Sequence, residues 1–230
     1  MTPLDHPLVA DITAHQRVNN SLLAPLERPL LRWLGPVVAR RADADACTLA
    51  GVAGAVLCFV GYTMSQYSAL FVAVATGGVV LHWLGDSLDG TAARLRGADR
   101  PRYGFYVDHF ADSLCQVLIF LGLGLSPYVG LAVACVSLVA YQSITIVVFL
   151  RTAVLGEFQL SFGKIGPTEG HALLVLLGLA IMIFGSTPVH VAGLRFSAYD
   201  IPVAAFGVLA AFHFLRVGLR DTLALRARNE

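Results

Sequence analysis

The sequence has few charged residues and almost no lysine. Only 13% of its 230 residues are Asp, Glu, Lys or Arg, and a single lysine stands beside fifteen arginines. Soluble domains carry about 25% charged residues, so this composition excludes an ordinary soluble domain and indicates a membrane protein. The net charge of +1 does not suggest a nucleic-acid partner, and we expect none.

The four cysteines have neither metal-site nor disulfide spacing. They are scattered through apolar stretches without a CxxC pair, at Cys47, Cys58, Cys115 and Cys135. This pattern predicts small buried side chains and excludes a disulfide framework or a cysteine metal site. The N-terminal stretch MTPLDHPLVADITAHQ is polar and contains acids, so we do not expect a signal peptide.

Apolar residues are concentrated in six segments, each of about the length that crosses a bilayer. The segments run over residues 47–64, 68–84, 105–125, 128–150, 169–184 and 199–215. The second is expected to continue as a helix into the polar stretch after it, and Asp43 or Asp45 to cap the first. We predict an all-α integral membrane protein with six transmembrane helices in a membrane domain over 43–220, followed by a tail over 221–230.

Residues 1–42 combine a polar tail with an amphipathic segment. Between residues 21 and 41, apolar side chains recur at helical spacing: Leu22, Leu23, Leu26, Leu30, Trp33 and Leu34. Glu27, Arg28 and Arg32 lie between them, and Pro25 and Pro29 are expected to prevent a long regular helix. A short amphipathic juxtamembrane helix in the headgroup layer fits this pattern, with a solvated linker as the alternative.

The positive residues fall on one side of the predicted topology. All of them except Arg195 lie in the N-terminal region, the loops after the second and fourth spans, or the C-terminal region. Cytoplasmic loops carry the excess of Lys and Arg. We therefore expect both termini to be cytoplasmic, in a bacterial inner membrane.

Four carboxylates lie at the edges of the second and third spans. Asp86 and Asp89 are three residues apart, and Asp108 and Asp112 are four apart, so each pair shares a helix face. Facing carboxylates repel each other unless divalent cations lie between them, and Mg²⁺ and Mn²⁺ prefer carboxylate oxygens. The alternative is four acids that end their helices in water. It is disfavoured because Asp108 and Asp112 enter a span, where acids are costly.

Small and basic residues between these acids suit a phosphate ligand. Gly90 and Ala93 lie beside Asp89 and allow a ligand to approach the backbone. Arg94 follows one turn later and can pair with a phosphate. Gly104 is expected to open the third spanning helix, whose amino end favours an anion. Together these residues predict a site for a diphosphate held by metals.

The pattern Asp86-x-x-Asp89-Gly90-x-x-Ala93-Arg94, then Gly104-x-x-x-Asp108-x-x-x-Asp112, resembles the signature of the CDP-alcohol phosphotransferases. The resemblance implies transfer of a substituted phosphate from a CDP-linked donor to an alcohol, release of CMP, and a homodimer. It also implies that the four aspartates hold one or two Mg²⁺ or Mn²⁺ ions. Asp89, Gly90, Ala93, Arg94, Gly104 and Asp108 would then bind the CDP moiety. Asp112 would be the general base for the acceptor hydroxyl.

The resemblance leaves two substrate classes open. One uses CDP-choline or CDP-ethanolamine with a lipid alcohol such as diacylglycerol. The other uses CDP-diacylglycerol with a small alcohol such as glycerol phosphate, serine or inositol. The segments DHFADS and GPTEG, at 108–113 and 166–170, resemble those of choline/ethanolamine phosphotransferases and favour the first class. Those enzymes have a glutamate where this chain has Phe105.

Several residues are candidates for the acceptor side. His109 could assist Asp112 or bond to a backbone carbonyl. Glu169 and His171 could contact the acceptor, with helix capping as the alternative. Arg151 and Lys164 could bind an acceptor phosphate or anchor at lipid headgroups.

Two further histidines lie in or near the apolar segments. His82 lies one turn before Asp86 and could hydrogen-bond to it, whereas no role is assigned to His213. A six-span transporter is a remote alternative. It is disfavoured because no internal repeat or pair of interrupted helices is evident.

Overall fold

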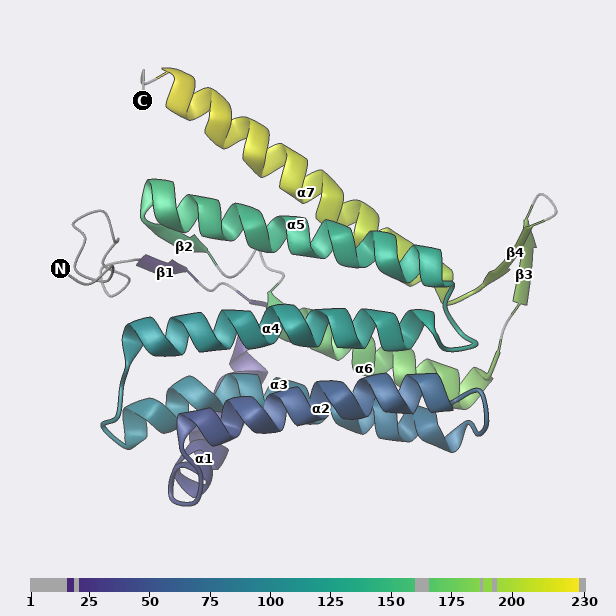
Figure 1. Cartoon of the computed structure of the whole chain (residues 1–230), viewed down its shortest axis with the longest axis horizontal. Coiled ribbons are helices and arrows are strands. Elements are labelled where there is room, and N and C mark those ends of the chain that lie inside the picture. The colour runs from purple at the N-terminus through teal and green to yellow at the C-terminus, as the bar shows by residue number, and fades with distance from the viewer. Residues whose placement is uncertain (1–15, 19–20, 160–165, 187, 192–193, 228–230) are drawn as a thin grey trace.

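A computed structural model describes the chain except residues 1–15, 19–20, 160–165, 187, 192–193 and 228–230. In this part of the chain, long helices form a bundle that carries two small two-stranded sheets (Figure 1). The helices are α1 (Ala24–Ala39), α2 (Ala44–Met64), α3 (Leu70–Leu95), α4 (Pro101–Gly124), α5 (Leu131–Leu155), α6 (Pro167–Phe184) and α7 (Asp200–Ala227). The strands are β1 (Gln16–Val18), β2 (Glu157–Gln159), β3 (Pro188–Val191) and β4 (Leu194–Ser197).

The six predicted spans are confirmed. Helices α2 to α7 are long and apolar enough to cross a membrane. Helix α3 continues past the apolar segment to Leu95, as expected, and so carries the first half of the acidic motif. Helix α7 extends to Ala227, so most of the predicted tail is helical.

Helices α2 and α3 approach each other closely through glycines. A Cβ atom built on Gly78 would lie 2.5 Å from the backbone nitrogen of Cys58, and one on Gly85 would lie 2.5 Å from that of Gly51. In lipid, such contacts replace the hydrophobic driving force that is missing between apolar helices. At the start of α2, Asp43 caps the helix as predicted, because its Oδ1 accepts from the Ala46 amide at 2.9 Å. These contacts fix the register between α2 and α3.

Helix α1 is longer and more regular than its prolines predicted. It has 16 residues and contains Pro29 and Pro36, so the expectation that Pro25 and Pro29 prevent a regular helix was wrong. Pro25 lies in the first turn, where no amide donor is needed. Pro29 and Pro36 have no amide proton to donate to the carbonyl one turn earlier. Both are exposed, so water or lipid headgroups can donate to those carbonyls instead.

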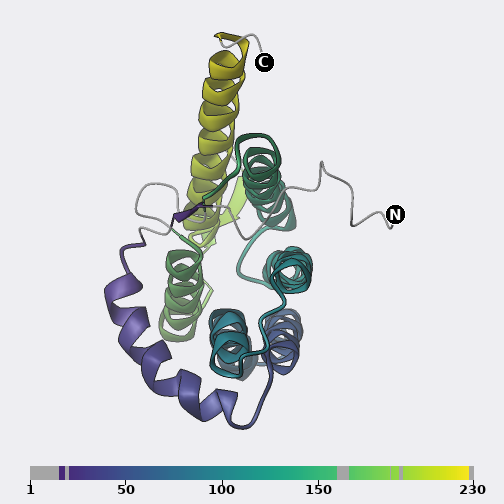
Figure 2. The same cartoon turned by 90° about the vertical axis from the view of Figure 1, so that its left-hand side faces the viewer.

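The predicted amphipathic helix is confirmed, and it has two distinct faces. Its inner face packs Leu31, Leu34 and Val38 beside Leu88 of α3. Its outer face exposes apolar side chains such as Leu26 and Trp33. In Figure 2, α1 is seen lengthwise while the spans beside it are seen end-on, so α1 runs across their direction.

The remaining spans are tied to one another at their ends. Helix α6 packs on α3, and α7 packs on α5. Asp200 at the start of α7 accepts from the Gly130 amide at 2.7 Å and the Ser197 amide at 2.8 Å. Strands β3 and β4 form an antiparallel hairpin between α6 and α7, and β1 pairs in parallel with β2 after α5.

Candidate active site

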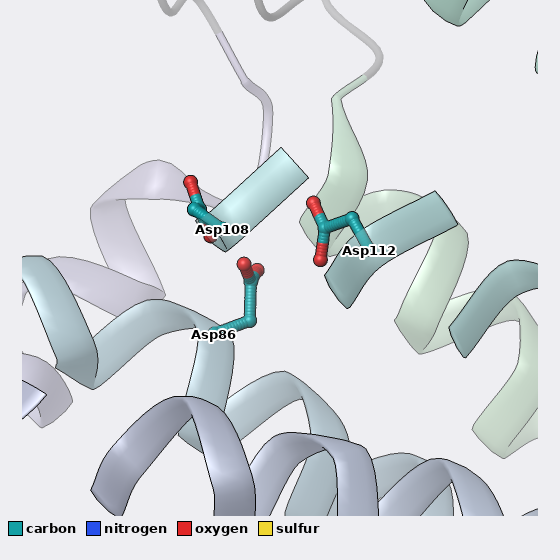
Figure 3. A group of neighbouring side chains, drawn as sticks. All are labelled: Asp86, Asp108 and Asp112. Atoms are coloured by element: carbon teal, nitrogen blue, oxygen red, sulfur yellow. The ribbon is translucent and has the colours of Figure 1, made fainter. Parts of the chain in front are cut away.

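Three of the four motif carboxylates converge. Asp86 comes from α3, and Asp108 and Asp112 come from α4. One carboxylate oxygen from each lies within 4.8 Å of the others. Figure 3 shows the three side chains pointing toward one shared space. The structure therefore brings the two acidic faces together, as their helical spacing predicted.

The fourth carboxylate, Asp89, is held beside this group by α2 and by its own helix. Its Oδ2 accepts from the Thr48 hydroxyl at 3.0 Å, and its Oδ1 accepts from the Gly90 amide at 2.5 Å. Asp89 is outside the closest group of three, but it lines the same small cavity of about 10 Å³. A space of this size holds about one water molecule or ion.

The donor set fits a divalent cation. In the described part of the chain, no lysine or arginine forms an ion pair with Asp86 or Asp112. Carboxylates gathered in a partly buried site are strongly destabilised unless a positive charge balances them. All-oxygen ligands are those that Mg²⁺ and Mn²⁺ prefer. Asp86, Asp108 and Asp112 would hold such an ion, with Asp89 at its edge.

The small and basic motif residues follow Asp89 on α3 and do not line the cavity of the carboxylates. A Cβ atom on Gly90 would lie 3.3 Å from Nη1 of Arg94, so the missing side chain lets the guanidinium lie over the helix. Arg94 Nη2 donates to the Thr91 hydroxyl at 3.3 Å and remains exposed. Ala93 lines a solvent-open hollow of about 330 Å³ together with Arg96 and Arg100.

Gly104 lies inside α4 and does not open it. The helix begins at Pro101, three residues earlier than expected, because proline suits the first helical position. The Gly104 amide already donates to the Arg100 carbonyl at 2.7 Å, so it is not free for an anion. A Cβ atom at Gly104 would meet nothing within 4 Å, so this position borders open space.

His109 is held against an aromatic group beside Asp108. Its Nδ1 lies 2.7 Å from the Phe105 carbonyl, which assigns the proton to Nδ1. The ring stacks on Phe105 at 4.3 Å between centroids and meets Phe149 and Phe158 edge-on at 5.4 and 5.2 Å. The backbone-bonded alternative for His109 is therefore observed, with Phe105 packed against its ring.

Glu169 has the capping geometry that was the alternative to an acceptor contact. Its Oε2 accepts from the Gly166 amide at 2.6 Å, at the start of α6. Its Oε1 accepts from the Ser21 hydroxyl at 2.5 Å and the Leu23 amide at 2.8 Å. These bonds use both carboxylate oxygens to tie α6 to the segment that begins α1.

The two histidines near α6 contact each other. The ring of His171 meets the ring of His82 edge-on, with centroids 5.0 Å apart. His82 Nδ1 lies 3.2 Å from the Gly51 carbonyl, instead of forming the expected bond to Asp86. The close approach of α2, which brings this carbonyl to α3, explains the difference.

Arg151, a candidate ligand for an acceptor phosphate, is engaged by carboxylates. Its guanidinium donates to Glu157 at 2.5 Å and to Asp221 of α7, which also accepts from Arg220. Arg151 is 5% exposed and ties α5 to α7 and β2, whereas Glu157 and Arg220 at the edge of the cluster are exposed. The other proposed phosphate ligand, Lys164, lies outside the described residues.

Two contacts at the site were missed in the sequence. Thr48 is one of many small polar residues, and its contact with Asp89 depends on the register between α2 and α3. The sequence predicts Glu27 only as a polar residue between the leucines of the amphipathic segment, whereas in the structure it accepts hydrogen bonds from α3 and α6. The only sequence feature that could have indicated the contacts of Thr48 and Glu27 is a polar residue on a helix face that turns toward the protein.

The comparison with protein families decides the class. The family model for CDP-alcohol phosphatidyltransferase matches residues 42–214, which cover the motif and most of the six spans. The chain belongs to the CDP-alcohol phosphatidyltransferase family. No curated protein matches the chain at a significant level. Membership supports a transferase of phospholipid synthesis that takes its phosphate group from a CDP-linked donor, and it confirms the family-level resemblance. The choline/ethanolamine subgroup stays a prediction.

Proposed function

We propose that the protein transfers phosphocholine or phosphoethanolamine from a CDP-alcohol to a lipid hydroxyl such as that of diacylglycerol, releasing CMP. The convergence of Asp86, Asp108 and Asp112 within 4.8 Å carries the proposed reaction, because such a group could hold a divalent ion on the diphosphate of a CDP-linked donor. The site lies in the second half of α3 and the first half of α4, and we propose that a soluble nucleotide and a membrane lipid meet there.

In the proposed reaction, Asp112 takes the proton from the acceptor hydroxyl. The hydroxyl oxygen forms a bond to the β-phosphorus of the donor, and the bond from that phosphorus to the bridging oxygen breaks. CMP leaves with the electron pair. A positioned carboxylate of this kind contributes about 10²–10⁴-fold to the rate.

The other motif residues bind and orient in this proposal. Asp86, Asp89, Asp108 and Asp112 hold one or two divalent ions. Such an ion neutralises charge on the diphosphate when it is bound. Gly90, Ala93 and Arg94 shape the surface against which the CDP moiety lies, and the exposed guanidinium of Arg94 is available to a phosphate. His109, fixed by the Phe105 carbonyl, borders the acceptor side.

The state of Arg151 favours a lipid acceptor over a phosphorylated one. A phosphate-binding arginine needs free donors, whereas Arg151 gives two of its nitrogens to Asp221 and Glu157. The segments DHFADS and GPTEG favour the same substrate class. Phosphatidyl transfer from CDP-diacylglycerol to a small alcohol is the alternative that the first experiment must address.

That experiment compares donors by thermal protection. The purified protein in detergent with Mn²⁺ is unfolded in the presence of CDP-choline, CDP-ethanolamine or CDP-diacylglycerol, since a bound ligand raises apparent stability by about 2.7 kcal/mol at one hundred times its Kd. We expect the first two to protect, and the protected donor to release CMP with diacylglycerol. Preferential protection by CDP-diacylglycerol would overturn the proposed substrate class.

A second outcome would contradict the proposal that the protein is an enzyme. If no donor and acceptor pair released CMP, while a metal-dependent flux appeared in proteoliposomes, the remote transporter alternative would replace the transferase.

From the arginine distribution, both termini and the site are proposed to face the cytoplasm of a bacterial inner membrane. The homodimer is proposed from the family resemblance alone.

A further inference from the structure

One carboxylate on α1 joins two helices that flank the candidate active site. Glu27 Oε1 accepts from the Ser87 hydroxyl at 3.2 Å, and Glu27 Oε2 accepts from the Thr168 hydroxyl at 2.9 Å. Ser87 directly follows Asp86 on α3, and Thr168 lies in the first turn of α6. A single side chain therefore connects the part of α3 next to Asp86 to the start of α6.

The start of α6 depends on α1 for more than this bond. Glu169, the next residue, accepts from Ser21 and Leu23 just before α1 begins. Farther along, α6 packs directly on α3, where a Cβ atom on Gly178 would lie 3.3 Å from the Cβ of Thr76. Helix α6 is thus held to α3 by direct packing along its length and through α1 at its first turn.

Stability alone does not explain a carboxylate at this position. A partly buried charge loses water contacts, and replacing such a group by apolar packing is often neutral or stabilising. Hydrogen bonds to two helices impose a geometry that apolar contacts do not, because each bond is directional. Through its two bonds, Glu27 holds the first turn of α6 at a defined position relative to Ser87 on α3.

We infer that Glu27 is a positioning residue that aligns the part of α3 around Asp86 with the start of α6. The inference rests on the proposed function, since the aligned groups are the proposed metal ligand and the helix beside it.

The test compares Glu27→Ala with Glu27→Gln. Losing this alignment is expected to weaken Mn²⁺ binding about tenfold or more, because the first turn of α6 and the part of α3 next to Asp86 are no longer held together. Mn²⁺ binding is measured by the electron paramagnetic resonance signal of the free ion, and kcat by CMP release. Glu27→Gln is expected to restore both, because its amide can accept from one hydroxyl and donate to the other. Arg28→Gln, on the exposed side of the same helix, is the matched control.

A double-mutant cycle separates positioning from general loosening. If Glu27 acts through Thr168, Glu27→Ala combined with Thr168→Val should bind Mn²⁺ about as weakly as Glu27→Ala alone. Independent, multiplying losses would overturn the inference. If Glu27→Ala does not fold, Ser87→Ala and Thr168→Val each remove one bond and carry the same test, and each must weaken Mn²⁺ binding at an unchanged unfolding midpoint.

Hydrogen exchange distinguishes failure of this inference from failure of the proposed function. In Glu27→Ala, the amides in the first turn of α6 are expected to exchange faster, with those in the middle of α2 unchanged. Unchanged exchange at α6 would overturn the inference even in an active enzyme. The opposite result is also distinguishable. If the wild-type protein released no CMP, while Glu27→Ala lost both Mn²⁺ binding and exchange protection at α6, only the proposed transferase function would be overturned.

Discussion

The hydroxyl of Thr48 on α2 donates a hydrogen bond to the carboxylate of Asp89 on α3, at 3.0 Å. The same hydroxyl lies 3.2 Å from the Ala44 carbonyl, one turn earlier on its own helix. A single hydroxyl proton cannot serve both acceptors fully, and the charged carboxylate is the stronger one. Thr48 therefore links the position of α2 to the orientation of a motif aspartate.

Replacing Thr48 by valine should disturb Asp89 without disturbing the fold. Valine keeps the shape of threonine but lacks the hydroxyl, and a hydrogen bond to a charged group contributes about 1.5–3 kcal/mol. We expect Thr48→Val to raise the KM for the CDP-linked donor about tenfold, while Thr48→Ser stays within about twofold of wild type. Steady-state CMP release measures both. Equal KM values for the two variants would show that the hydroxyl does not orient Asp89.

Asp112→Asn should separate chemistry from binding. Asparagine retains the size of the side chain but cannot take a proton at neutral pH, so we expect kcat to fall by about 10²–10⁴-fold. Protection of the fold by the CDP-linked donor should largely survive. Asp89→Asn is the comparison. If both variants lost donor binding to the same extent, Asp112 would be a ligand-binding residue and not the base.

The glycine contacts between α2 and α3 should be essential only where the helices touch. A Cβ atom on Gly78 would lie 2.5 Å from the Cys58 backbone, whereas one on the adjacent Gly77 would meet nothing within 4 Å. Gly78→Ala is expected to destabilise the fold by about 1–3 kcal/mol or more through overpacking. Gly77→Ala is expected to stabilise its helix by about 0.5–1 kcal/mol. Thermal unfolding in detergent measures both, and similar midpoints would contradict the packing described.

Removing the Arg151 side chain should destabilise the fold and leave the KM for the acceptor unchanged. The side chain is 6% exposed and that of its partner Asp221 is 15% exposed, so deleting Arg151 removes hydrogen bonds to charged groups in a largely buried place. Asp221 keeps Arg220 as a partner, so we expect Arg151→Gln to lower the free energy of unfolding by about 1.5–3 kcal/mol. Arg216→Gln, at an exposed position of α7, should change it by less than about 0.5 kcal/mol. A stable Arg151→Gln enzyme with a raised KM for a phosphorylated acceptor would instead assign Arg151 to the acceptor site.

The parts that could be predicted from sequence are those encoded by local periodicity. The six spans follow from apolar length, and the meeting of Asp86 with Asp108 and Asp112 follows from helical spacing on two helices joined by a short loop. Thr48 and Glu27 could not be predicted in the same way. Their partners lie 41 and 60 residues away, and each contact depends on how two helices are rotated against each other. Glycine and leucine packing sets that rotation, and no local pattern of residues reports it.

Helix α1 shows a second limit of local rules. A proline inside a helix costs about 3 kcal/mol when its missing hydrogen bond is buried. Pro29 and Pro36 lie on an exposed part of α1, while Leu31 and Leu34 hold the opposite side against α3. Tertiary packing therefore outweighs the local preference. Which face of a helix meets the protein is settled only in the folded chain.

The tie between Arg151 and Asp221 has a consequence for the biogenesis of the protein. The two residues are 70 positions apart, so Arg151 leaves the ribosome and enters the membrane with α5 well before α7 supplies Asp221. An arginine at the end of a new span can reach the headgroups until its partner arrives. The final pairing therefore waits for the last helix. Truncation within α7 should leave five inserted spans and an Arg151 that has lost its α7 partner, which would expose the incomplete chain to quality-control proteolysis.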